Sequence, residues 1–143
     1  MKVIAIDFGT KRTGVAVSDE GGSLARPLAT LAETNAPRLA ASLARLVAEH
    51  RPSEVLIGNP RRLDGTPGTH AAAVEALAAS LRALPAIAGI PVILWDEALT
   101  TVEAHARLLE GGAGRRKRKE AIDRAAAAVL LQDYLDHRRG SPR

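Results

Sequence analysis

The chain has 143 residues, 46% of them hydrophobic and 25% charged, which is typical of one globular domain with a core of its own. It contains no cysteine, and this excludes a disulfide framework, a thiolate zinc site and a cysteine nucleophile. The formal charge of +4 is a reason, of small weight, to consider nucleic acid as a partner, and the apolar runs are too short for a membrane span or a signal peptide. We therefore expect a cytoplasmic protein without a membrane partner.

The first part of the chain predicts three strands followed by a helix. Apolar runs at 2–7 and 13–19 predict two strands joined by a hairpin-like connection, and 26–31 predicts a third strand. Residues 35–50 then have the periodicity of an amphipathic helix, with Asn35 as its N-cap.

The second part predicts αβ units. Short apolar runs predict buried strands at 53–58 and 90–97, and helical patterns cover 69–84, 100–110 and 115–137. The helix at 100–110 opens with a capping box made by Thr100 and Glu103. Residues 85–89 either extend or break the preceding helix, and their pattern leaves both open. The order β-β-β-α-β-α-β-α-α predicts a mixed sheet with helices packed on it.

Acidic residues occupy three positions where a site can form. Asp7 ends the first strand, and Asp96 and Glu97 end a later one, where ligand sites of α/β sheets lie. Taken alone, each of these positions is better explained as a loop cap or a surface charge than as part of a site. Asp123 shares the apolar face of the last helix, where a carboxylate needs either a buried ion pair or a functional partner.

A cluster of these carboxylates predicts a divalent metal site. Like charges repel when they lie close together, and a bound Mg²⁺ ion removes that repulsion through its preference for oxygen ligands. Two such ions about 4 Å apart activate a water molecule and stabilise the leaving oxygen of a phosphodiester. The four histidines are isolated in the sequence, which argues against zinc.

Four ordered motifs resemble the RuvX family, also called YqgF-like, whose members are described as pre-16S rRNA nucleases or Holliday junction resolvases. The motifs are "IAIDFGTKRTGVAVSD", "LIGNPRRLDGTPG", "DEALTTVEAHARLL" and "RRKRKEAIDRAAAAVLLQDYLD", and the similarity runs from Lys2 to Asp136. It implies an RNase H-like fold, a five-stranded mixed sheet flanked by helices. It also implies one nuclease domain over 1–138, followed by a basic tail at 139–143.

The resemblance also implies the active-site residues. Asp7, Glu97 and Asp123 match the family's acidic triad. The resemblance implies that they are the catalytic residues and the ligands of Mg²⁺, for which Mn²⁺ is a possible substitute. Strand alternation then turns the side chain of Asp96 the other way. This chain departs from the family's "DERLTT" motif, because Ala98 replaces an arginine that is a candidate phosphate contact.

Basic residues predict contacts to the substrate backbone. The candidates flank the acidic positions and are Lys11, Arg12, Arg61, Arg62, Arg115, Arg116, Lys117, Arg118 and Lys119. Aromatic residues make up only 2% of the chain, so recognition of structured RNA or branched DNA should rest on charge and shape. Maturation of pre-16S rRNA is the preferred reading and junction cleavage in DNA recombination and repair the alternative, with a monomer or a homodimer left open.

Two other classes of function compete with the nuclease. The stretch "IDFGTKRTGVAV" also resembles the phosphate-binding hairpin of the sugar kinase, actin and Hsp70 ATPases, but 143 residues provide room for one of their two lobes, and a Walker A pattern is absent. A nucleic-acid-binding module without chemistry would use the basic run at 115–119. The acidic positions argue against it, because carboxylates hinder phosphate binding unless metal offsets them.

Overall fold

The computed structural model describes residues 1–9, 11–33, 35–60, 71–97 and 115–138. Its strands are β1 (Val3–Phe8), β2 (Thr13–Ser18), β3 (Ala25–Leu31), β4 (Glu54–Pro60) and β5 (Val92–Glu97). Its helices are α1 (Ala36–His50), α2 (Ala71–Arg82), the short 3₁₀ helix η1 (Pro85–Ile87) and α4 (Arg115–Arg138). The predicted helix at 100–110, with its capping box, lies outside the described residues.

The five strands form one mixed sheet in the order β3-β2-β1-β4-β5. The central strand β1 pairs antiparallel with β2 and parallel with β4, and β4 pairs parallel with β5. The antiparallel start and parallel continuation confirm the mixed sheet predicted from the order of elements.

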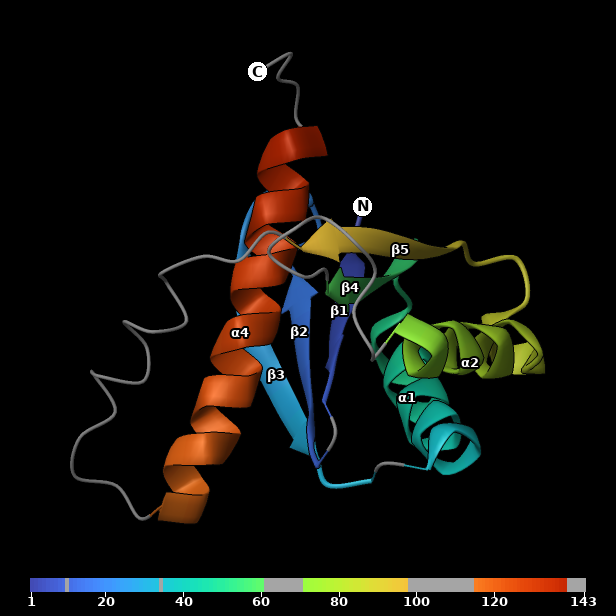
Figure 1. Cartoon of the computed structure of the whole chain (residues 1–143). Helices are drawn as coiled ribbons and strands as arrows, with labels where there is room; N and C mark the ends of the chain where they lie inside the picture. The colour runs from blue at the N-terminus through green and yellow to red at the C-terminus, as the bar shows by residue number, and fades with distance from the viewer. Residues whose placement is uncertain (10, 34, 61–70, 98–114, 139–143) are drawn as a thin grey trace.

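Helices cover both faces of this sheet, with α1 and α2 on one side and α4 on the other (Figure 1). Strand alternation separates the two cores. Ile4 and Ile6 of β1 pack in the cluster formed with α1 and α2, and Val3 and Ala5 pack against α4. The next odd-numbered residue of β1, Asp7, therefore belongs to the face of the sheet that α4 covers.

The N-terminus of α1 confirms the predicted cap. The Asn35 side-chain oxygen accepts a hydrogen bond from the Arg38 backbone N–H at 3.1 Å, which satisfies one of the helix's free donors. The sequence left open whether residues 85–89 extend the preceding helix. In the structure they do not continue α2, because Pro85 begins the separate 3₁₀ helix η1. Ile87 of η1 is buried.

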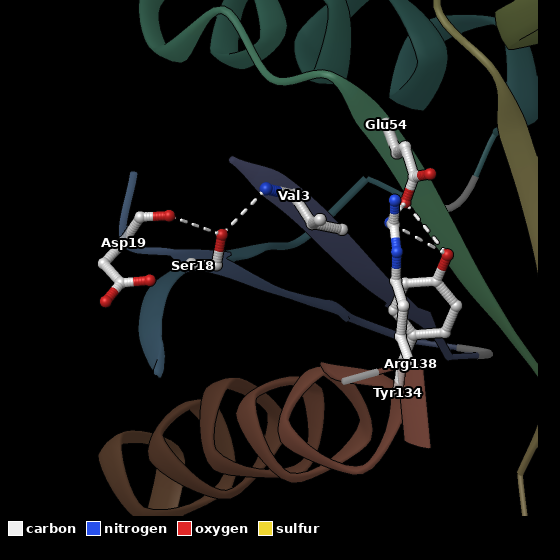
Figure 2. A network of polar contacts seen from close by, with 6 residues as sticks. All are labelled: Val3, Ser18, Asp19, Glu54, Tyr134 and Arg138. Atoms are coloured by element: carbon white, nitrogen blue, oxygen red, sulfur yellow. Dashed lines mark hydrogen bonds and ion pairs between the residues drawn. The ribbon is translucent and has the colours of Figure 1, made fainter. Parts of the chain in front are cut away.

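Polar contacts that the sequence did not predict fasten α4 to the sheet. The Gln132 side-chain amide accepts from the Ala25 N–H at 2.9 Å and donates to the Ser23 carbonyl at 2.9 Å, so the helix is tied to the start of β3. One turn from its end, the Tyr134 hydroxyl donates to Glu54 of β4 at 2.9 Å, and Arg138 pairs with the same carboxylate (Figure 2).

The same end of the sheet is closed by a buried serine. The Ser18 hydroxyl accepts from the Val3 N–H at 2.8 Å and donates to the Asp19 carbonyl at 2.9 Å, which joins β1 to the end of β2 (Figure 2). In the described part of the chain, the helices are too short or too polar to cross a membrane.

Candidate active site

Asp7 lies in the central strand, half-buried, with a glycine on each neighbouring strand. It pairs with Gly14 of β2, and because Ile6 is level with Ile57, the next residue of β4, Gly58, is its neighbour on the other side. Side chains of directly opposed residues come within about 5 Å of each other in a sheet. Neither of the two neighbouring residues therefore places a side chain beside the Asp7 carboxylate.

This arrangement extends across the whole sheet. Gly14 pairs with Thr30 of β3, and Gly58 pairs with Trp95 of β5. We call the resulting line of residues the Asp7 row; it runs Thr30, Gly14, Asp7, Gly58, Trp95. Its outer members carry side chains, and its centre carries one carboxylate between two glycines.

The β5 end of the Asp7 row is closed by aromatic packing. The Trp95 ring lies edge-on to the Tyr134 ring, with 5.1 Å between centroids, and its N–H donates to Asp133 at 3.2 Å. The indole thus packs against the last turns of α4 rather than standing free as a platform for bases.

The β3 end of the row meets a cation that the sequence reasoning missed. Arg124 of α4 is half-buried and donates to the Thr30 hydroxyl at 3.4 Å. The sequence signal that could have indicated this residue is its position directly after Asp123. Helical periodicity, however, predicts that Arg124 lies off the face of the helix that packs on the sheet.

The other two predicted metal ligands occupy elements that lead to the same region. Glu97 ends β5, which runs parallel to β1 through β4, so both strands end at one edge of the sheet. Asp123 belongs to α4, the helix that covers the Asp7 face. The side chains of Asp96, Glu97 and Asp123 lie outside the described part, so their meeting with Asp7 stays a prediction. Within the described part, no three acidic or histidine side chains form a metal-binding group.

The predicted basic contacts are placed only in part. Lys11 is exposed and Arg12 half-buried in the connection that follows β1. Gly9 is required there, since a Cβ atom at this position would lie 2.3 Å from the Arg12 carbonyl oxygen. The backbone of 115–119 forms the first turns of α4, but these side chains, like Arg61, Arg62 and Ala98, lie outside the description.

Comparison with solved structures defines the class of fold. Thermus thermophilus RuvC matches with a TM-score of 0.56 at 20% identity, over 98% of this chain and 97% of that chain. A Fowlpox virus resolvase, solved in complex with Holliday junction DNA, matches with a TM-score of 0.53 at 10% identity, over 94% and 99%. The sheet and its helices therefore form an RNase H-like fold of the RuvC type, as predicted.

The chain belongs to the RuvX family, whose model, described as "Holliday junction resolvase", matches residues 1–137. A relative from Carboxydothermus hydrogenoformans is 40% identical over 138 residues, which is 96% of this chain and 98% of the relative. Another, from Syntrophus aciditrophicus, is 43% identical over 136 residues, 95% of this chain and 89% of the relative. Both carry the name "Putative pre-16S rRNA nuclease". The predicted family is thus confirmed.

Proposed function

We propose that the protein is a Mg²⁺-dependent nuclease that hydrolyses phosphodiester bonds in the maturation of the pre-16S rRNA end. One observation carries the proposal: a half-buried carboxylate, Asp7, lies in the central strand between Gly14 and Gly58, on the face covered by α4. The names of the relatives support nuclease activity and this substrate.

The residues at this site fit a hard divalent cation. Carboxylate oxygens are the ligands that Mg²⁺ prefers, and Asp7 is only half-buried, so its carboxylate keeps some exposure to solvent. Asp7, Glu97 and Asp123 would hold the metal, and Mn²⁺ would substitute for Mg²⁺. When bound, the metal supplies an activated water and neutralises charge on the phosphate. The chain itself would hold Asp7 and Glu97 at the ends of two strands and Asp123 on a helix.

The substrate would be held through its backbone. Lys11 and Arg12 follow the β1 strand directly, so they lie near the carboxylate in the chain and favour a phosphate-bearing ligand. Pre-16S rRNA is a structured RNA, and a cytoplasmic location belongs to the same proposal. The alternative is a Holliday junction, which the family's description favours.

Asp7→Asn tests the catalytic assignment. We expect kcat to fall about a thousandfold or more, because a neutral amide cannot replace the carboxylate charge on which stabilisation of the transition state depends. RNA binding should persist. Without metal, the variant should be at least as stable as the wild type, since like-charge repulsion falls. Glu75→Gln, an exposed acid of α2 on the other face, is the matched control and should leave activity unchanged.

The assay compares matched pre-16S rRNA, single-stranded and four-way-junction substrates, with Mg²⁺, with Mn²⁺ and with EDTA. Substantial cleavage by Asp7→Asn, or full activity in EDTA, would contradict the metal-dependent mechanism. Cleavage confined to junctions would replace the RNA substrate with the DNA alternative.

A further inference from the structure

The single tryptophan of the chain, Trp95, joins the outermost strand β5 to the helix α4. Its indole N–H donates to the Asp133 carboxylate at 3.2 Å, and its ring lies edge-on to those of Tyr134 and His137, each with 5.1 Å between centroids. The backbone of α4 packs chiefly on β1, β2 and β3, and β5 runs towards it from the far edge of the sheet (Figure 1). The indole therefore connects two elements that are not joined by strand pairing.

The helix side of this contact is itself fixed to the sheet. The buried Tyr134 donates its hydroxyl hydrogen to Glu54 of β4 at 2.9 Å, and Arg138 pairs with the same carboxylate (Figure 2). Trp95 thus packs against a ring that is anchored on β4, the strand that also pairs with β5. The β4–β5 ladder, the Tyr134 hydrogen bond and the Trp95 contact form a closed set of links, which fixes how β5 lies relative to α4.

The two elements that Trp95 joins are those that carry two of the proposed metal ligands. Ile93 and Trp95 pack in the cluster on the α4 side of the sheet, so strand alternation assigns the next odd-numbered residue of β5, Glu97, to the same face. Asp123 belongs to the same continuous helix as Asp133. Because Mg²⁺ demands near-ideal octahedral geometry, a site built across these two elements depends on their separation.

We propose that Trp95 is a positioning residue of the metal site, which holds β5 against α4 and so fixes the separation between the strand end that carries Glu97 and the helix that carries Asp123. This inference rests on the proposed nuclease site. In this role Trp95 contacts neither the metal nor the substrate and acts only through the elements that bear the carboxylates. Residues that orient the ligands of a metal typically change its affinity by about 10- to 100-fold when they are replaced.

Calorimetric titration of the protein without substrate tests this role directly. Trp95→Ala should weaken Mg²⁺ binding about tenfold or more. Ca²⁺, which accepts variable geometry, should lose less affinity, whereas a general loss of folded protein would affect both ions equally. In the nuclease assay, kcat at low Mg²⁺ should fall and should recover when the Mg²⁺ concentration is raised, with KM for RNA unchanged.

The hydrogen bond to Asp133 gives a milder test, which keeps the fold because Asp133 is exposed. Asp133→Ala and Trp95→Phe each remove this bond and should each weaken Mg²⁺ binding about threefold. The double variant should be no weaker than either single one, since both changes remove the same interaction. Asp133→Asn keeps an acceptor oxygen and should retain most of the affinity.

Gln132→Ala is the matched control. It removes the polar contacts that tie α4 to Ser23 and Ala25 at the opposite edge of the sheet. It should lower the melting temperature but leave the affinities for Mg²⁺ and Ca²⁺ unchanged. Thermal unfolding of every variant checks the fold, and Asp133→Ala decides the matter if Trp95→Ala does not fold.

The outcomes distinguish this inference from the function on which it rests. A wild type that binds Mg²⁺ and cleaves RNA, with Asp133→Ala and Trp95→Phe equal to it in Mg²⁺ affinity, would overturn the role of Trp95 alone. A wild type that binds Mg²⁺ but does not cleave would overturn the proposed function, and the metal titrations would still decide the role of Trp95. Absence of Mg²⁺ binding by the wild type would overturn both.

Discussion

Asp7 and Thr13 lie at the same edge of the sheet, but their environments differ. Asp7 belongs to the α4 face, whereas Thr13 pairs with Phe8, which packs in the cluster with α1 and α2. Thr13 is fully buried, and its hydroxyl has no hydrogen-bond partner among the described residues. Such a hydroxyl is desolvated without compensation.

Thr13→Val should therefore stabilise the protein by about 1 kcal/mol, since a methyl group replaces the unsatisfied hydroxyl. Ser18→Ala is the matched contrast, because that buried hydroxyl bonds to Val3 and Asp19 and its removal should destabilise by about 1–2 kcal/mol. Urea unfolding of both variants measures the difference. Equal losses in the two would show that the Thr13 hydroxyl has a partner.

At the scale of elements, the last turns of α4 are held to β4 by a titratable group. Burial and the hydrogen bond to Glu54 raise the pKa of Tyr134 above its ordinary value of 10.0, with Arg138 opposing the shift. Because the folded pKa exceeds the unfolded one, this contribution to stability is complete below pH 10.0 and is lost as pH rises through the folded pKa.

Tyr134→Phe should lower the free energy of unfolding by about 1 kcal/mol at neutral pH, through loss of the bond to Glu54. It should also remove part of the alkaline loss of stability seen in the wild type. Ultraviolet titration of the chain's single tyrosine measures the pKa directly. Identical stability-pH curves for both proteins above pH 10 would contradict this docking role.

The basic start of α4 is expected to act on substrate rather than on stability. Replacing Arg115, Arg116, Lys117 and Arg118 with alanine should weaken RNA binding and flatten its salt dependence by about one log-log unit per lost phosphate contact. Filter binding over a salt series measures this. An unchanged slope would mean that the run is only a solvated surface.

Much of the element order followed from local sequence. The strands and α1 lie within one or two residues of their predicted limits, because alternation, periodicity and the Asn35 cap are local signals. The contacts that place α4 were not predictable in this way. Gln132 meets Ala25 across 107 residues, and Arg124 meets Thr30 across 94, so each depends on how the helix crosses the sheet.

The candidate site, like the fold, could be predicted from local sequence only in part. The apolar run before Asp7 pointed to a carboxylate at a strand end, and the structure places it there. Its two glycine neighbours, Gly14 and Gly58, follow from strand register, which no single-strand pattern specifies. The convergence of Glu97 and Asp123 on Asp7 remains a prediction.

At the scale of the whole molecule, the identity of the substrate is linked to the oligomeric state of the protein. A junction resolvase cuts two strands related by two-fold symmetry and is suited to a symmetric dimer, whereas trimming one RNA end needs one site. The outer strand β3 carries Pro27, which cannot donate a ladder hydrogen bond, so extension of the sheet through this edge is disfavoured.

We expect a monomer in light scattering at micromolar concentration, which trims the pre-16S rRNA end and leaves four-way junctions intact. The same preparation should be measured with each substrate, because nucleic acid can drive assembly. A stable two-fold dimer that nicks junctions in symmetric pairs would reverse the assignment.

The position of α4 in the chain also has a consequence during translation. All five strands precede it, and the core that includes Ile4, Ile6, α1 and α2 is complete without it. Val3 and Ala5, on the opposite face, stay uncovered until α4 leaves the ribosome and docks. Asp123 arrives with that helix, so the proposed active site is assembled only after the sheet has been synthesised. A nascent chain that still lacks α4 would then carry Asp7 without the proposed ligand Asp123, and we expect it not to cleave the RNA around it.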